Sequence, residues 1–196
     1  MDTLHRHTLA ALVTNEPGVL AKVAGMFAAR GFNIDSLVVG RTENPELSRM
    51  TIVVNGSDAM LEQVRKQLQK LVEVVKVVDY KDSAFVERDL MLVQVSTGEG
   101  DSRRRSEVVE LASLFRAKVV DVASDRITVE LSGTEDKIEA FIELIQPFGI
   151  IEMARTGVIA MPRGRSGAAP SLRPAREAVA AGGQRPQVDE GSLPPG

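Results

Sequence analysis

The sequence predicts an α+β fold made of two ferredoxin-like βαββαβ domains. Two observations predict it: runs of β-branched residues alternate with helical periodicities in the order βαββαβ, and this order occurs twice before residue 160. A βαββαβ unit of about 75 residues folds as an antiparallel sheet with both helices on one face. The two halves share no close sequence identity, so the repeat is one of topology.

In the first half, a strand over residues 7–14 leads into a helix whose apolar side chains recur at helical spacing until Gly31. Two β-branched strands follow, over residues 33–42 and 47–56, and the turn residues ENPE between them indicate a hairpin. A second amphipathic helix and a strand over residues 72–80 end this half. The apolar helix positions are Val19, Leu20, Val23, Met26 and Phe27, and then Met60, Leu61, Val64, Leu68 and Leu71.

The second half repeats this order after the polar stretch KDSAFVER. A strand over residues 89–96 precedes a helix around Val108 and Leu111, and two strands follow over residues 117–123 and 125–133. A last helix has apolar side chains at the spacing i, i+3, i+4 and i+7, before a closing strand that begins at residue 150. Those four apolar side chains are Ile138, Phe141, Ile142 and Ile145.

These patterns divide the chain into four segments. We expect a first domain over residues 4–80, a linker over 81–88, a second domain over 89–160 and a tail over 161–196. The tail is rich in Pro, Gly, Ala and Arg and has almost no large apolar side chain. Such a segment buries too little surface to offset the entropy lost on ordering, so we predict that it is disordered.

Composition argues against several classes of function. A net charge of −3 supplies no general basic field, which disfavours binding to nucleic acid or to an anionic membrane. The chain has no cysteine, which removes thiolate nucleophiles and the usual zinc ligand sets and suits a cytoplasmic protein. No apolar run approaches the roughly 18 to 20 residues of a membrane span, and the first ten residues lack the apolar core of a signal peptide.

The second strand of the first domain, residues 33–42, is a candidate dimer interface. In the usual strand order of this fold it lies at a sheet edge, and the sheet face away from the helices is free. The strand contains Leu37, Val38 and Val39 and has no protective Lys or Pro in its middle. We therefore expect a homodimer formed across this edge.

The loop from Asn15 to Gly18, between the first strand and the first helix, is a candidate anion site. Pro17 suits an early helical position because its missing N–H is one that a helix leaves unpaired. Gly18 lets a ligand approach the backbone, and a helix N-terminus favours a carboxylate or phosphate. Asn15 either caps the helix or binds a ligand. Pairing of two edge strands would bring Asn33 of one chain toward this loop of the other.

An amino acid fits this arrangement. Its carboxylate would meet the helix amides, its ammonium group an Asn carbonyl, and its side chain the nearby apolar residues. The candidate effector-binding residues are Asn15, Gly18, Val19, Leu20, Asn33 and Ile34. The alternative is that Asn15, Pro17 and Gly18 are ordinary turn and capping residues and that Asn33 merely follows the helix end at Gly31.

Other patterns are less specific. His5 and His7 would project to one side of a strand, but no third metal ligand accompanies them. The stretch TGEGDSRRRSE lacks the GxxxxGK[ST] pattern of a phosphate-binding loop and is typical of a solvated helix start. Asp35 and Glu130 are isolated carboxylates, so no self-contained active site is predicted.

Four further charges are either candidate subunit contacts or ordinary surface charges, namely Arg49, Glu87, Arg88 and Asp89. An RNA-binding module shares the βαββαβ order but stacks bases on aromatic side chains of its central strands, and here those strands have none. A free-standing amino-acid sensor is a further alternative.

The first domain resembles the ACT domain of the small regulatory subunit of acetohydroxyacid synthase, also called acetolactate synthase, and the second half continues the resemblance. It extends over about residues 4–161. The stretches that carry it are NEPGVLAKVAGMFAARGFNIDSL, ELSRMTIVV, LEQVRKQLQKLVEVVKV, FVERDLMLVQV, LFRAKVVDVASDRITVELSGTEDKIEAFIELI and IIEMARTGVIAM.

The resemblance implies a non-catalytic subunit of branched-chain amino-acid biosynthesis. Such a subunit activates a separate large catalytic chain and confers feedback inhibition by a branched-chain amino acid, usually valine. It implies thiamine diphosphate, FAD and magnesium in the catalytic partner and no cofactor in this chain. It also implies effector sites between paired ACT domains, with Asn15, Gly18, Asn33 and Ile34 at matching positions. Some relatives have Ser where Ala21 stands, so a hydroxyl contribution is missing there.

Overall fold

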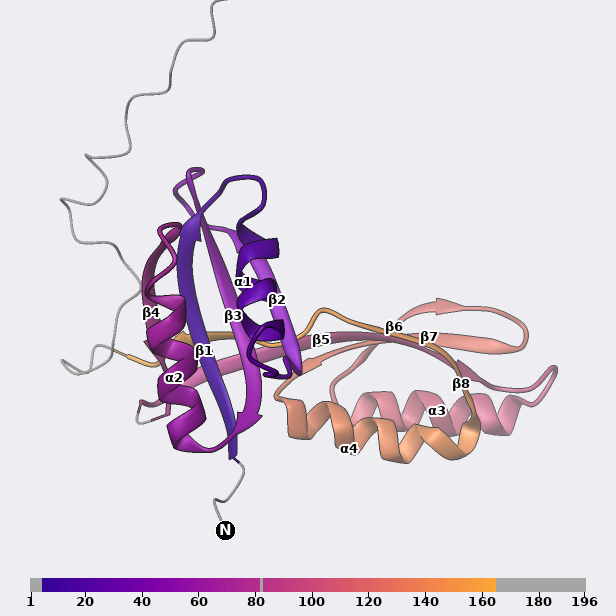
Figure 1. Ribbon diagram of the computed structural model, residues 1–196. Helices are drawn as coiled ribbons and strands as arrows, with labels where there is room; N and C mark the ends of the chain where they lie inside the picture. The colour runs from indigo at the N-terminus through magenta and orange to yellow at the C-terminus, as the bar shows by residue number, and fades with distance from the viewer. Residues whose placement is uncertain (1–4, 82, 165–196) are drawn as a thin grey trace, which may run out of the picture.

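The computed structural model describes residues 5–81 and 83–164 and contains two antiparallel sheets, each with two helices packed on one face (Figure 1). The predicted α+β class and the repeated βαββαβ order are confirmed. Residues 165–196, which make up most of the predicted tail, lie outside the described part of the chain. Among the described residues, the helices are too short or too polar to cross a membrane.

The first sheet has the strand order β2-β3-β1-β4, which places β2 at an edge as predicted. Its elements are β1 (His5–Thr14), α1 (Val19–Ala28), β2 (Ser36–Arg41), β3 (Leu47–Gly56), α2 (Asp58–Leu68) and β4 (Val74–Asp79). Strand β2 begins later than the expected residue 33, since its pairing with β3 starts at Ser36 opposite Val53. Alternate residues of β1 and β3 face the helices and form a core with Val23, Phe27 and Leu61.

Helix α2 shows how local chemistry defines an element. The hydroxyl of Ser57 accepts a hydrogen bond from the Met60 N–H at 3.4 Å and so caps the helix start. Leu61, Val64 and Leu68 then recur on one face and are buried against the sheet.

Beside the buried face of α2, Glu62 and Arg65 form an ion pair with a measurable pH signature. Hydrogen bonds from Arg65 to Glu62, at 2.7 and 2.9 Å, are the largest cause that lowers the pKa of Glu62 from 4.5 to about 2. The folded chain favours the charged form of Glu62. The pair therefore stabilises the folded state fully above pH 4.5, and this contribution is lost as the pH falls toward 2. In an NMR titration we expect the midpoint of Glu62 near 2 and, in Arg65→Gln, a move back toward 4.5. A native midpoint near 4.5 would contradict the pair.

The second sheet has the order β6-β7-β5-β8, and a ninth strand pairs with β5. Its elements are β5 (Phe85–Ser96), α3 (Ser102–Leu114), β6 (Lys118–Val122), β7 (Arg126–Gly133), α4 (Glu135–Ile145), the short 3-10 helix η1 (Gln146–Phe148), β8 (Ile150–Arg155) and β9 (Ile159–Pro162). Helices α3 and α4 bury Val108, Ile138 and Phe141 against the strands, as their spacing predicted.

The face of the first sheet away from its helices is covered, which corrects the expectation that it is free. Strand β5 starts at Phe85, inside the stretch expected to be a linker, and its first four residues pair with β9. Figure 1 shows this ribbon crossing behind the first sheet. A third core forms there from Ala10, Leu12, Val78, Tyr80 and Ala160, with Leu47 and Phe85 against it. The boundary between the domains stays a prediction.

Strand β9 was not predicted from the sequence. It has four residues and extends to Pro162, two residues into the segment expected to be disordered. Ala160 is buried and its neighbours Ile159 and Met161 are exposed, but all three are apolar. The sequence therefore shows no alternation of polar and apolar residues that would mark a strand. Its pairing partner lies more than seventy residues earlier in the chain, at Phe85 to Arg88.

Candidate functional site

The loop that joins β1 to α1 is held by Asn15. The backbone N–H of Asn15 donates to the Glu46 carbonyl at 2.7 Å, and its side-chain amide donates to the Pro45 carbonyl at 2.9 Å. Its side-chain oxygen accepts a hydrogen bond from the Ser48 hydroxyl at 3.1 Å. These contacts tie the loop to the turn between β2 and β3. Of the two roles expected for Asn15, helix capping is not observed, because α1 has no side-chain cap.

Gly18 is the N-cap of α1 and has a φ of +86°, a left-handed conformation that favours glycine. A Cβ added there would meet no atom within 4 Å, so the space beside it is open. Among the described residues, the N–H groups of Gly18, Leu20 and Ala21 make no hydrogen bond. The first turn of α1 also contains no acidic side chain. The helix start therefore presents unpaired donors and positive dipole charge that suit a small carboxylate.

The two apolar candidates beside these amides differ in their exposure. Val19 is 4% exposed and belongs to the core of the first domain, so it positions the helix start from inside. Leu20 is 47% exposed and offers its side chain next to the free amides. Of this pair, only Leu20 presents a surface that a ligand can contact.

Asn33 and Ile34 lie just before β2. The side-chain nitrogen of Asn33 donates to a carboxylate oxygen of Asp35 at 3.2 Å. The side-chain oxygen of Asn33 makes no hydrogen bond among the described residues. The other carboxylate oxygen of Asp35 accepts from Asn55. Ile34 is half-buried and packs against the core of the first domain. The free oxygen of Asn33 is thus an available acceptor for an ammonium group.

One chain does not bring the two parts of the candidate site together. The register pairs Ser36 with Val53 at one end of β2 and Arg41 with Ser48 at the other. Asn33 precedes the first end, whereas Asn15 is bonded to Ser48 at the second. The five steps between these ends span roughly 17 Å at about 3.4 Å per residue. The outer edge of β2 has no strand partner within the described part of the chain.

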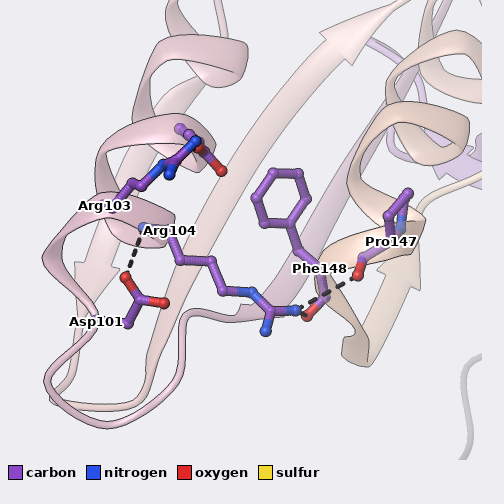
Figure 2. A pocket seen from close by; sticks show the side chains of 6 residues that line it. Asp101, Arg103, Arg104, Pro147 and Phe148 are labelled. Carbon is purple, nitrogen blue, oxygen red and sulfur yellow. Dashed lines mark hydrogen bonds and ion pairs between the residues drawn. The ribbon is translucent and has the colours of Figure 1, made fainter.

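The arginine-rich start of α3 borders a surface groove of about 410 Å³. Figure 2 shows Arg104 reaching across this groove toward Pro147 and Phe148. Its guanidinium donates to the Phe148 carbonyl at 2.5 Å and lies 5.7 Å from the centre of the Phe148 ring. Arg103 pairs with Glu107 at 3.0 Å. These contacts use the guanidinium groups within the chain, in agreement with a solvated helix start rather than a phosphate site.

His7, Asp35 and Glu130 each contact another residue of the same chain. The ring of His7 contacts the Gly56 carbonyl at 3.1 Å, and in the described ranges no three His, Asp or Glu side chains gather as metal ligands would. Asp35 is engaged by the two asparagines already named, and Glu130 lies 3.5 Å from Lys118.

Three of the charges that are candidate subunit contacts bind other parts of the same chain. Arg49 donates to the Tyr80 hydroxyl at 2.8 Å and also to the Ala160 carbonyl. Glu87 pairs with Arg6 at 3.2 Å. Burial raises the pKa of Tyr80 above its usual 10.0, although the nearby Arg49 opposes this shift, so the phenol stays protonated at neutral pH.

Asp89 is the third of these charges and is 2% exposed. Its carboxylate accepts hydrogen bonds from Arg155 at 2.8 Å and from the Thr156 hydroxyl at 3.1 Å. Sequence reasoning missed these partners because they lie far along the chain. The only sequence signal was a charged residue inside or beside an otherwise apolar strand.

Two family models match the chain. One, described as an AHAS small subunit-like ACT domain, matches residues 9–76. The other, described as the small subunit of acetolactate synthase, matches residues 88–164.

Curated relatives and a solved structure agree with these matches. A probable acetolactate synthase small subunit of Archaeoglobus fulgidus is 54% identical over 159 residues, which cover 81% of this chain and 98% of that protein. The acetolactate synthase small subunit of Mycolicibacterium smegmatis is 47% identical over 161 residues, 82% of this chain and 93% of that protein. The crystal structure of an acetolactate synthase small subunit from Thermotoga maritima has a TM-score of 0.74 at 43% identity and covers 82% of this chain and 98% of that one.

Proposed function

The chain belongs to the family of acetolactate synthase small subunits, and from this premise we propose that it activates a separate catalytic subunit and makes that subunit sensitive to valine. In this proposal the catalytic chemistry, with its thiamine diphosphate, FAD and magnesium, belongs to the large subunit. We place the pair in the cytoplasm, which suits a chain without cysteine.

The observation that carries the valine proposal is the start of α1. The unpaired N–H groups of Gly18, Leu20 and Ala21 belong to exposed residues and lie beside the apolar side chain of Leu20. No acidic side chain lies in the first helical turn to compete for these donors. A free amino acid with a small branched side chain combines a carboxylate for the amides with an apolar group for Leu20.

A second copy of the chain would complete the site. Antiparallel pairing of two β2 edges runs the strands in opposite directions, so the segment before β2 of one copy would approach the α1 start of the other. The free side-chain oxygen of Asn33 would then accept from the ammonium group, and Ile34 would add apolar contact. Asn15, whose side-chain oxygen already accepts from Ser48, would position the loop rather than bind the ligand.

Valine bound between two copies would regulate by favouring one relative pose of the two domains over another. A ligand shifts such an equilibrium only through different affinity for the two states, and a coupling of about 1 to 3 kcal/mol changes an affinity roughly 5-fold to 150-fold. A few hydrogen bonds and one apolar side chain supply an energy of this size.

The test is acetolactate formation by a purified catalytic subunit, with and without this chain, across a valine titration. We expect the chain to raise the rate and valine to reverse the rise. A chain that binds valine by calorimetry yet changes no rate would instead support the free-standing sensor. The RNA-binding alternative loses support from the fold, because β5 and β9 cover the sheet face that RNA-recognition modules use.

A further inference from the structure

The edge strand β2 is in direct contact with a segment of the second half of the chain. The hydroxyl of Ser36, the first residue of β2, accepts a hydrogen bond from the Val158 N–H at 3.1 Å. Gly157 also lies against β2, because a Cβ added to it would lie 2.6 Å from Ser36 Oγ and 2.9 Å from Val38 Cγ2. Gly157 also has a φ of +82°. A side chain at this position would therefore force Ser36, Val38 or the segment itself to shift.

On one side, this segment is anchored in the second domain. Thr156 exchanges two hydrogen bonds with Leu90 of β5: its N–H donates to the Leu90 carbonyl at 2.9 Å, and its hydroxyl accepts from the Leu90 N–H at 3.1 Å. Arg155 bonds to the buried Asp89 and also to Glu139 of α4 at 2.5 Å. A displacement of this segment would therefore act on β5 through Thr156 and on α4 through Arg155.

On its other side, the segment is anchored in the first domain. Val158 and Ala160 are buried, and the Ala160 carbonyl accepts from Arg49 of β3. Arg49 lies opposite Gly40 of β2 in the strand register. The segment is therefore bonded to the first sheet at two points, Ser36 of β2 and Arg49 of β3. The edge of this sheet carries the proposed effector site.

We propose that residues 155–160, the junction segment, transmit the state of β2 to the second domain, with Gly157 as the positioning residue at which the two meet. This inference rests on the proposed function, which makes β2 the edge between two copies. Close-packed contacts convert a small shift at one site into a discrete rearrangement. Here Ser36 is bonded to Val158, two residues after Thr156 in the chain. Thr156 is bonded to Asp89, which is bonded to Arg155, and Arg155 is bonded to Glu139.

The test compares Gly157→Ala with Gly100→Ala. Both glycines have positive φ, +82° and +76°, so both substitutions carry a similar backbone cost. Only Gly157→Ala adds a steric clash with β2, because a Cβ at Gly100 meets nothing within 4 Å. Gly100 lies in the loop before α3 and is not part of the junction segment. The difference between the two variants therefore reports on the contact with β2.

For each variant we would measure valine binding by calorimetry and the ratio of holoenzyme activity without valine to that at saturating valine. Where the native ratio is about 5 or more, as typical couplings allow, we expect Gly100→Ala to keep it and Gly157→Ala to lower it to about 1 to 2. We expect both variants to bind valine with affinities within about twofold of the native value, because the ligand-contacting groups are unchanged.

Three outcomes would overturn the inference. Native-like inhibition in Gly157→Ala would show that the contact transmits nothing. Loss of valine binding in that variant would show that the segment shapes the binding site instead of relaying its state. If valine does not inhibit the holoenzyme with the native chain, the proposed function is wrong and the inference falls with it. The native chain therefore distinguishes this outcome from the first two, in which only the inference is wrong.

Ser36→Ala supplies an independent check in case Gly157→Ala does not fold. It deletes the acceptor for the Val158 N–H without adding bulk. We expect the inhibition ratio to fall in the same direction but by less, with valine binding retained. An unchanged ratio in a folded Ser36→Ala chain would also overturn the inference.

Discussion

A subunit that carries Gly18→Asp is expected to activate its catalytic partner as the native chain does, yet to be insensitive to valine. The new carboxylate would lie at the unpaired amides where the proposed site receives the carboxylate of valine. Two unit charges about 4 Å apart repel by about 1 kcal/mol in water and about 4 kcal/mol near a protein surface, which weakens binding roughly 5-fold to 1,000-fold. The measurement is the valine titration of acetolactate formation.

Gly18→Asn is the matched control. Asparagine has nearly the shape of aspartate, tolerates a left-handed φ about as well, and carries no charge. Because a side chain at Gly18 meets no atom within 4 Å, neither variant is expected to clash. We expect Gly18→Asn to remain largely inhibited. Equal loss of inhibition in both variants would argue against a carboxylate site, and full inhibition of Gly18→Asp would refute the site.

Arg155→Met is expected to lower the free energy of unfolding by about 3 to 5 kcal/mol, the usual cost of leaving a buried charge without its partner. The side chain of Asp89 is 1% exposed, and Arg155 donates to it from two nitrogens at 2.7 and 2.8 Å. Among the described residues no other cation forms an ion pair with Asp89. Chemical denaturation measures the loss, with an unchanged dependence on denaturant as the sign of an intact fold.

Two controls separate the buried charge from the loss of one arginine. The double variant Asp89→Asn/Arg155→Met removes both charges, and we expect it to recover part of the lost stability. Arg126→Met removes an exposed arginine that pairs with Asp125 at 2.8 Å, and we expect its denaturation midpoint to stay nearly native. A loss below about 1 kcal/mol in Arg155→Met would show that water reaches and stabilises the carboxylate.

The helices and main strands were predictable because their signals are local. The apolar spacing of α2 and α4 and the alternation in β7 reflect burial on one face, which imposes a period that can be read along the chain, and β3 is recognisable as a β-branched run. The order βαββαβ then placed β2 at an edge without any coordinates. The loop from Asn15 to Gly18 was identifiable as a candidate site because its residue types are those of a helix start.

The contacts of the candidate site required the tertiary structure. Asn15 is bonded to Ser48, which lies 33 residues away, and Ser36 is bonded to Val158 across 122 residues. No periodicity records such pairs: the first depends on how the β1–α1 loop lies against β3 of the same sheet, and the second on how the second half of the chain lies against β2. The same holds for β9, whose four residues become a strand only because Phe85 to Arg88 lie beside them.

Local periodicity in the sequence therefore determined the class of fold and the edge position of β2, and residue types typical of a helix start singled out the candidate effector loop. The packing of distant segments decided which groups are free to act there: Leu20 and the oxygen of Asn33 remain available, whereas Val19 is buried and Asn15 is engaged. It also decided that Gly157 lies against β2. The physical reason is that side-chain availability depends on neighbours in space, and those neighbours come from parts of the chain that no local pattern connects.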